Sequence, residues 1–144
     1  MRVGIVTGEY PPMQGGIGAY THILAKEMVT QGAEVTIFSS TKAKGSSDTI
    51  SVTNAAKTWN ITSVRGIHRW AKEHHIDILN IQFQTAAYGM SPWIHFLPQL
   101  TTIPVVTTFH DLRHPYLFPK AGRLRDWIVM HLVKHSKGVI VTNQ

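Results

Sequence analysis

The stretch TGEYPPMQGGIGAY (7–20) holds the residues whose types and spacing most clearly suggest chemistry. Gly15 and Gly16 stand immediately before a segment with helical periodicity that begins at Ile17. Glycines admit positive φ and let a ligand approach bare backbone N–H groups, and a helix N-terminus carries partial positive charge. The pattern predicts a phosphate-binding loop, stiffened by the two preceding prolines. The alternative interpretation is a long turn whose glycines only cap the helix.

Two common nucleotide-binding motifs do not fit this stretch. A dinucleotide-binding G-x-G-x-x-G follows its strand tightly, and an acidic residue ends the second strand. Here Thr21 stands where the third glycine belongs, and the second predicted strand ends in Ser39-Ser40-Thr41. A P-loop needs a Lys-Ser/Thr pair after its last glycine, and this loop has none. The spacing therefore disfavours NAD binding and excludes a P-loop here.

The nine histidines raise the question of a metal site. His131 and His135 have i, i+4 spacing on a predicted helix, but Leu132 stands where a zinc protease has its glutamate. His110 and His114 share that spacing in a predicted loop. The chain has no cysteine, and no third ligand is spaced nearby. We therefore expect solvated or packed histidines and no metal.

The elements that must position these residues follow from hydrophobic periodicity. Val- and Ile-rich runs of strand length alternate with helical patterns, which predicts an α/β fold: a doubly wound, mostly parallel, Rossmann-like sheet flanked by helices. In such sheets ligands bind beyond the carboxyl ends of the strands. The predicted strands cover residues 2–7, 32–40, 49–53, 76–83, 104–109 and 138–142, and the predicted helices residues 17–32, 61–74, 91–97 and 121–135.

Composition bounds the class of protein. The chain has 144 residues, of which 43% are hydrophobic and 15% charged, and this suits one compact domain. No run approaches the ~18 apolar residues of a membrane span, and the chain opens directly with a strand, so we expect a soluble cytoplasmic domain. The formal charge of +6 favours anionic partners. Nucleic acid is not expected among them, because no stacking platform or nucleic-acid fold signature is present.

At this point several segments together carry a family resemblance. The opening MRVGIVTGEYPPMQGGIGAYTHILAKEMVTQGAEVTIFSS resembles that of the family-4 retaining glycosyltransferases, which have the GT-B fold. VVTTFHDL resembles that family's strand ending in T-x-H, and GVIVTNQ its last strand before the interdomain region. The resemblance implies that residues 1–144 form a single Rossmann-like, acceptor-side N-terminal domain. It also implies that the C-terminal, donor-binding domain is absent from this chain.

The resemblance implies a function and roles for three residues. Such enzymes move a sugar from a nucleoside-diphosphate sugar to a hydroxyl acceptor; retention of configuration is implied by the family alone. Gly15 and Gly16 would give backbone amides to the donor diphosphate. His110 would lie near the reacting sugar, to bind a hydroxyl or stabilise an oxocarbenium-like transition state; the alternative is a loop histidine that bonds backbone.

No D-x-D motif is present, so we expect a metal-independent enzyme without a cofactor, in which the nucleotide sugar is a substrate. One domain supplies only one side of a GT-B cleft, so the 144 residues alone should be inactive. The alternative to an enzyme is a non-catalytic module of the same half-fold that binds a sugar or nucleotide phosphate.

Candidate acceptor-binding residues follow two predicted strands. Gln84 and Tyr88 come after the fourth predicted strand, and Asp111 and Arg113 after the fifth. Tyr88 can equally be a packing residue, and Asp111 a turn or cap residue. These four side chains are expected to line the acceptor pocket.

A basic, aromatic segment completes the candidates. The usual explanation of such a charge run is a solvated face. The alternative is peripheral association with the inner face of a membrane, through basic residues near anionic headgroups and aromatic rings in the interface. Its members are Arg113, Tyr116, Phe118, Lys120, Arg123, Arg125 and Trp127.

Overall fold

Strands and helices alternate along the chain, as the hydrophobic periodicity predicts. The computed structural model describes residues 1–44, 49–110 and 122–142. The strands are β1 (Arg2–Thr7), β2 (Glu34–Ser40), β3 (Ile50–Ala56), β4 (Ile78–Phe83), β5 (Val105–Phe109) and β6 (Gly138–Val141). The helices are α1 (Gly16–Thr30), α2 (Ile61–Glu73), α3 (Leu97–Leu100) and α4 (Gly122–His135), with short 3₁₀ helices η1 (Thr85–Tyr88) and η2 (Trp93–Phe96).

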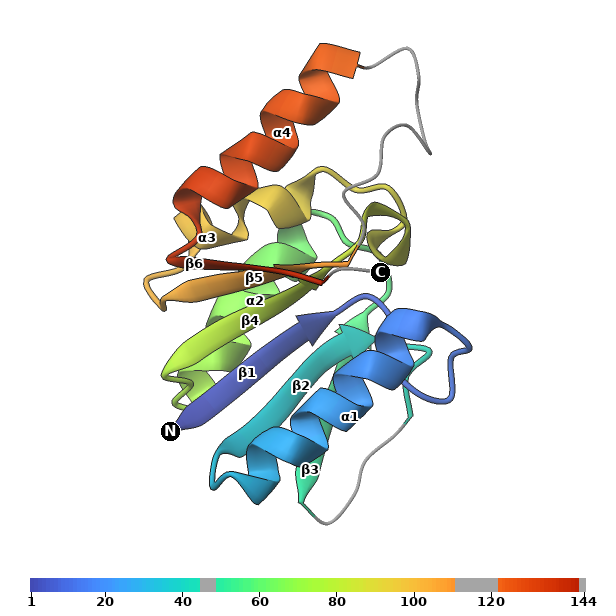
Figure 1. Ribbon diagram of the computed structural model, residues 1–144, viewed down its shortest axis with the longest axis vertical. Helices are drawn as coiled ribbons and strands as arrows, with labels where there is room; N and C mark the ends of the chain where they lie inside the picture. The colour runs from blue at the N-terminus through green and yellow to red at the C-terminus, as the bar shows by residue number, and fades with distance from the viewer. Residues whose placement is uncertain (45–48, 111–121, 143–144) are drawn as a thin grey trace.

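The six strands form one sheet in the order β3-β2-β1-β4-β5-β6 (Figure 1). All five neighbouring pairs are parallel, so the predicted α/β, doubly wound sheet is confirmed. The chain first builds outward from β1 to β3 and then returns to build β4, β5 and β6 on the other side. The strand order therefore reverses between β1 and β4, where open α/β sheets bind ligands.

The largest differences from the predicted element bounds lie in two places, and the other elements shift by no more than two residues at an end. β3 runs to Ala56, beyond the predicted end at residue 53, because pairing with β2 continues to Ser40↔Ala56 across a register shift. The predicted helix over 91–97 is instead η2 followed by α3. Pairing with a neighbouring strand decided the first difference, and such tertiary contacts are not encoded in local propensity.

Helices cover both faces of the sheet. α1 lies in front of the sheet in Figure 1, and α2 lies behind it. Successive side chains of a strand point to opposite faces, so Ile5 and Ile37 pack in the cluster on the α1 side. Ile81 and Phe83 of β4 pack in the cluster that contains the buried residues of α2. The central strands are thereby fixed on the face opposite α1 by apolar packing.

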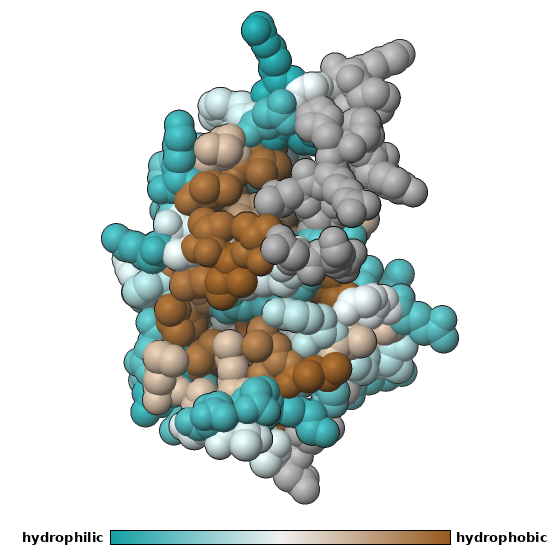
Figure 2. All heavy atoms as spheres, in the orientation of Figure 1, coloured by the Kyte–Doolittle hydropathy of each residue, from teal (hydrophilic) through white to brown (hydrophobic). Residues whose placement is uncertain are grey.

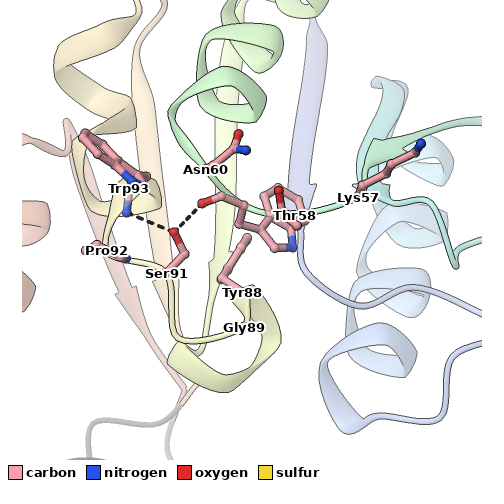
Figure 3. A pocket seen from close by; sticks show the side chains of 9 residues that line it. Lys57, Thr58, Asn60, Tyr88, Gly89, Ser91, Pro92 and Trp93 are labelled. Carbon is pink, nitrogen blue, oxygen red and sulfur yellow. Dashed lines mark hydrogen bonds between the residues drawn. The ribbon is translucent and has the colours of Figure 1, made fainter.

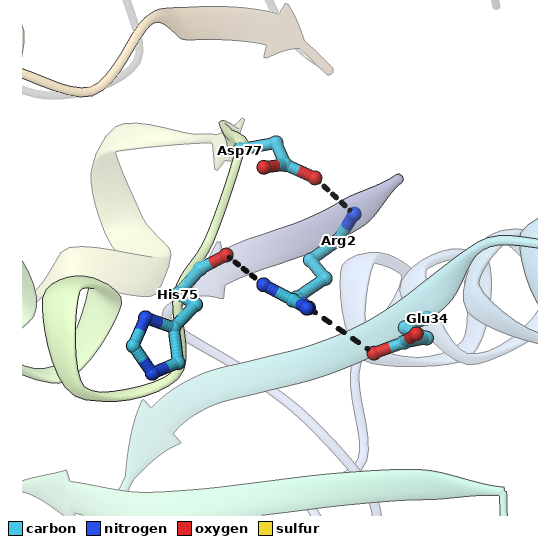
Figure 4. Close-up of polar contacts among 4 residues, drawn as sticks. All are labelled: Arg2, Glu34, His75 and Asp77. Atoms are coloured by element: carbon cyan, nitrogen blue, oxygen red, sulfur yellow. Dashed lines mark hydrogen bonds and ion pairs between the residues drawn. The ribbon is translucent and has the colours of Figure 1, made fainter.

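Arg2 ties together the amino ends of three strand regions (Figure 4). Its backbone N–H donates to an Asp77 carboxylate oxygen at 2.7 Å, and its guanidinium donates to the His75 carbonyl at 3.4 Å. Its Nε lies 3.4 Å from a Glu34 carboxylate oxygen, an exposed ion pair. These contacts join β1 to β2 and to the start of β4, at the edge of the sheet opposite to the carboxyl ends of the strands.

β6 lies at the edge of the sheet and keeps much of its apolar surface in contact with solvent. Val139, Ile140 and Val141 are 42%, 49% and 50% exposed. Figure 2 shows apolar side chains gathered on this face over α4 and β6. Within the described parts of the chain, no helix is both long enough and apolar enough to cross a membrane.

Candidate functional site

The carboxyl ends of β1 and β4 meet at the reversal of strand order. Thr7 pairs with Gln82 in the register of these two strands. The glycine loop leaves β1 there, η1 follows β4, and His110 follows β5 immediately. Segments that lie far apart in the sequence are thus gathered at one edge of the sheet.

The glycine loop is held against the fold by its own residues. A Cβ atom at Gly8 would lie 2.0 Å from the Ala87 carbonyl oxygen, so only glycine permits this close approach of the loop to η1. Tyr10 is buried, and its hydroxyl lies 2.9 Å from His22 Nδ1. The Pro11 carbonyl accepts from the Lys44 N–H at 3.0 Å. The loop is therefore anchored on both sides, while Gly15 is half-buried and Gly16 is exposed.

Gly15 and Gly16 form the N-terminus of α1, as predicted, but without positive φ. Gly15 is the N-cap residue with an extended backbone (φ −173°), and no side chain caps the helix. A Cβ at Gly15 would meet a Glu9 carboxylate oxygen at 1.9 Å, whereas a Cβ at Gly16 would meet nothing within 4 Å. The Glu9 carboxylate ends a flexible side chain that can move aside, so the chain's own packing requires glycine at neither position.

His110 is a buried histidine at the end of β5. Its backbone N–H donates to the Phe83 carbonyl at 3.0 Å. Its ring Nε2 lies 2.6 Å from Gln82 Oε1, and the ring of Tyr20 meets it edge-on at a centroid distance of 4.7 Å. Burial lowers the pKa of His110 below its usual 6.5, which favours the neutral imidazole. The Gln82 side chain therefore orients the ring. The alternative interpretation, a loop histidine that bonds backbone, does not include this contact.

The candidate acceptor residues have different positions. Gln84 is half-buried and immediately precedes η1. Tyr88 is 1% exposed, and its one hydroxyl proton is shared between the carbonyls of Val6 (2.9 Å) and Gln82 (3.0 Å). Burial raises the pKa of Tyr88 well above its usual 10. The packing interpretation thus describes this side chain, and Asp111 and Arg113 lie outside the described residues.

An open pocket of about 390 Å³ borders Tyr88. Figure 3 shows that it lies between the loop before α2 and the segment from η1 to η2. The Ser91 hydroxyl donates to the Trp59 carbonyl and accepts from the Trp93 N–H at 3.3 Å, which joins the two walls. Sequence reasoning missed this pocket, although two tryptophans mark it. Its lining residues are Lys57, Thr58, Trp59, Asn60, Tyr88, Gly89, Ser91, Pro92 and Trp93.

The histidine pair on α4 is hydrogen-bonded within the protein. His131 Nε2 lies 2.7 Å from Gln99 Oε1, and His135 Nδ1 lies 2.8 Å from the His131 carbonyl. Their rings are in contact with each other, at a centroid distance of 4.2 Å. Across the described residues, no group of three or more His, Asp or Glu side chains is arranged to hold a metal ion.

Of the basic, aromatic segment, the structure describes only the part on α4. Arg123 is exposed, and Trp127 is 55% exposed. Arg125 lies 3.7 Å from Asp126. The remaining members, Arg113, Tyr116, Phe118 and Lys120, lie outside the described residues.

Comparison with known proteins decides the family. Residues 14–144 match the sequence model of the family described as Glycosyltransferase Family 4. The chain belongs to glycosyltransferase family 4. The family-4 match covers α1 and every later element, and the predicted family resemblance is thereby confirmed. No curated protein is significantly similar in sequence to the chain.

Solved structures support the same fold for this family-4 domain. Sucrose-phosphate synthase from Thermosynechococcus elongatus superposes with a TM-score of 0.73 at 13% identity, over 99% of this chain and 42% of that one. A DNA/pantothenate metabolism flavoprotein from Streptococcus pneumoniae gives 0.53 at 11% identity, over 98% and 80%. A short-chain dehydrogenase/reductase variant from Serratia marcescens gives 0.52 at 13% identity, over 92% and 66%. The family-4 chain therefore spans less than half of the synthase.

Proposed function

We propose that this domain forms the acceptor side of a glycosyltransferase that moves a sugar from a nucleoside-diphosphate sugar to a hydroxyl acceptor. In this proposal a second, donor-binding domain faces the edge of the sheet where β1, β4 and β5 end. The observation that carries the proposal is that two candidate groups lie at the same edge of the sheet. In a family-4 chain, an uncapped helix N-terminus and an oriented imidazole both lie at the carboxyl ends of the strands.

The α1 N-terminus supplies the chemistry for an anion. Its first backbone N–H groups lack partners within the helix, and no side chain caps them. In this function the amides of Gly15 and Gly16 bind the donor diphosphate. The exposed position of Gly16 and the open space at its Cβ support such an approach. The nearby Glu9 carboxylate must move away from an incoming phosphate, because like charges at this separation repel.

His110 supplies a polar group for the sugar. A neutral ring hydrogen-bonds a hydroxyl without adding charge, and its fixed orientation lets it favour the geometry of the transition state. Metal chemistry is not part of the proposed mechanism, and retention of configuration is inferred from the family. Gln84 and the pocket beside Tyr88 are the described features best placed to meet an acceptor.

The test uses the complete protein that carries this domain. We expect His110→Ala to lower kcat by about 10²-fold, the usual loss when a positioned transition-state stabiliser is removed, with the fold retained by circular dichroism. His135→Ala, on the far end of α4, is the matched control and should leave kcat unchanged. An effect of His110→Ala on KM alone would assign the residue to ground-state binding.

The same assays distinguish the proposal from the non-catalytic alternative. The complete protein should turn over at least one nucleoside-diphosphate sugar, and residues 1–144 alone should turn over none. Binding of such a sugar without turnover by the complete protein would instead establish a sugar-nucleotide-binding module. Transfer by the 144 residues alone would contradict the two-domain proposal.

A further inference from the structure

β4 carries two buried amide side chains on one face of an otherwise apolar strand. Asn80 is 5% exposed and Gln82 is 0% exposed. They lie two positions apart and therefore point to the same side of the sheet, opposite to Ile81 and Phe83. Burying an amide is unfavourable unless its hydrogen bonds are satisfied. Two such residues in a central strand therefore call for a specific role, and neither was a candidate from the sequence.

The two amides form a continuous chain of hydrogen bonds that ends at His110. His110 Nε2 lies 2.6 Å from Gln82 Oε1, and Gln82 Nε2 donates to Asn80 Oδ1. Asn80 Nδ2 in turn donates to the Val106 carbonyl at 3.3 Å and to Thr108 Oγ1 at 3.1 Å. The chain thus runs from the end of β5 across β4 and back to β5.

The direction of donation in this chain follows from its last member. A backbone carbonyl only accepts hydrogen bonds, so the Asn80 NH₂ must face Val106. The Asn80 oxygen then faces Gln82, which must present its own NH₂ to it. The Gln82 oxygen is left facing His110. An oxygen acceptor at 2.6 Å requires a proton on His110 Nε2.

From this geometry we propose that Gln82 and Asn80 are positioning residues that hold His110 in its Nε2–H tautomer. A neutral imidazole carries one N–H, so Nδ1 becomes the ring's only lone-pair acceptor. Within the described part of the chain, Nδ1 has no hydrogen-bond partner. His110 therefore accepts a hydrogen bond from a substrate hydroxyl and does not donate one.

The edge contact with Tyr20 limits rotation of the same ring. The hydrogen bond to Gln82 and the ring contact with Tyr20 both restrain His110, so the ring has one plane and one tautomer. In the resulting arrangement the substrate group that meets His110 is a hydroxyl with a proton to give, such as a sugar hydroxyl. The catalytic consequence rests on the proposed function, whereas the tautomer does not.

The tautomer is tested by NMR on the complete protein labelled with ¹⁵N-histidine, at pH 7.5. The His110 resonances are assigned by their loss in His110→Gln. We expect one N–H type nitrogen at Nε2 and one unprotonated nitrogen at Nδ1, in a single state. A proton on Nδ1, a mixture of tautomers or a doubly protonated ring in the unaltered protein would overturn the proposal.

Two substitutions separate the hydrogen-bond chain from simple packing. Asn80→Leu frees the Gln82 amide to rotate, so a population with a proton on Nδ1 should appear although residue 80 does not touch His110. Thr108→Val keeps the Val106 carbonyl and should keep the single tautomer. Gln82→Met, which removes the acceptor itself, serves if Asn80→Leu does not fold. An unchanged His110 spectrum in folded Asn80→Leu or Gln82→Met would contradict the role assigned to these residues.

Kinetics distinguish failure of this inference from failure of the proposed function. Asn80→Leu should lower kcat by between ~10-fold and the ~10²-fold expected for loss of the ring, since a wrong tautomer presents a donor where an acceptor is needed. Thr107→Val removes a buried hydroxyl on the opposite face of β5. It is the control for Asn80→Leu, because it removes a buried polar group outside the hydrogen-bond chain, and kcat should stay near its starting value. If His110→Ala leaves kcat unchanged while the tautomer is fixed, the hydrogen-bond chain stands and the proposed role of His110 is wrong.

Discussion

Gly16 is a position where the protein's own packing does not require glycine. Its φ is not positive, and a Cβ there would meet open space. Under the proposed function, we expect Gly16→Val in the complete protein to fold normally but to lose turnover, because the side chain would cover the backbone amides at the α1 N-terminus. The measurements are kcat/KM for the donor, expected to fall by at least ~10-fold as for loss of one oriented donor group, and thermal stability.

Gly66 gives a matched control for this experiment. It is also a helical glycine with open space around its Cβ, but it lies on α2. Gly66→Val should leave both stability and turnover near their starting values, since valine costs a helix no more than glycine does. Normal donor kinetics in Gly16→Val would show that the glycine loop is only a spacer.

Buried histidines make the fold sensitive to acid. Burial lowers the pKa of His95 below 6.5, as it does for His110. The unfolded chain then binds more protons than the folded one between the lowered pKa and 6.5. The folded state keeps its full free energy of unfolding above pH 6.5, where both histidines are neutral. This free energy falls as the pH drops through the lowered pKa values of the folded state. We expect a lower free energy of unfolding at pH 5.5 than at pH 7.5, measured by urea denaturation.

Substitution of His95 checks the origin of this dependence. His95→Gln should flatten the stability–pH curve, because a residue that does not titrate replaces the buried one. His74→Gln, at an exposed position on the same side of the sheet, should leave the slope unchanged. Equal slopes in all three proteins would mean that other groups set the acid sensitivity.

At the residue scale, the sequence indicated candidates that stand next to a predicted strand or helix. It did not indicate residues whose role depends on which strands pair with each other. The position of His110 after a strand was readable from VVTTF, and Gly15 and Gly16 from their place before a helix. Gln82 was read only as part of the buried strand IDILNIQF, because its contact with His110 depends on the parallel register of β4 with β5. That register is a tertiary property, so a pattern along one segment does not reveal it.

At the scale of elements, α4 is the helix with the most conspicuous exposed apolar surface among those described. Leu124, Trp127 and Met130 are exposed, and Arg123 lies beside them in the first turn. We propose that this surface meets an anionic membrane. The complete protein should bind vesicles with anionic lipid more tightly than neutral ones, and less so as salt rises. A basic residue near such a surface contributes about 1 kcal/mol, so Arg123→Glu should weaken partitioning several-fold.

The control for this experiment carries the same charge change elsewhere. Arg69 is exposed on α2, and Arg69→Glu should leave partitioning unchanged. Co-sedimentation with vesicles at low ionic strength measures both variants. Equal partitioning to neutral and anionic vesicles, or equal loss in both variants, would indicate that α4 is an ordinary solvated helix.

Elements with strong periodicity were predicted well, and those that depend on neighbours were not. β1 was predicted with its observed bounds, and α2 to within one residue, because burial of one face leaves a clear pattern. β3 has mixed burial and was predicted too short, since its length is set by pairing with β2. η1 was not predicted, because its packing depends on Tyr88, whose hydrogen bonds reach back to β1.

For the molecule as a whole, the cluster on the α2 side of the sheet is the larger of the two buried apolar clusters of the described residues. Ile81 lies at the centre of β4 and is fully buried in that cluster. We expect Ile81→Ala to reduce the free energy of unfolding by about 2–5 kcal/mol, the usual cost of removing a large buried aliphatic side chain. Urea denaturation measures this, with Ile23→Ala, at a site 69% exposed, as the matched control expected to be near neutral.

The pairing of β1 with β4 also dictates an order of assembly. The Arg2 N–H and its partner Asp77 are 75 positions apart in sequence, so β1 remains without its second neighbour until the chain has been synthesised through β4. Contacts that close long loops form late, since the lost chain entropy must be offset by earlier contacts. A nascent chain can build β1, α1 and β2 first, while the junction of Thr7 with Gln82 forms only after β4 docks. The place where the strand order reverses therefore takes shape only after β4 docks on β1, and ligand recognition that also uses His110 must await β5 as well.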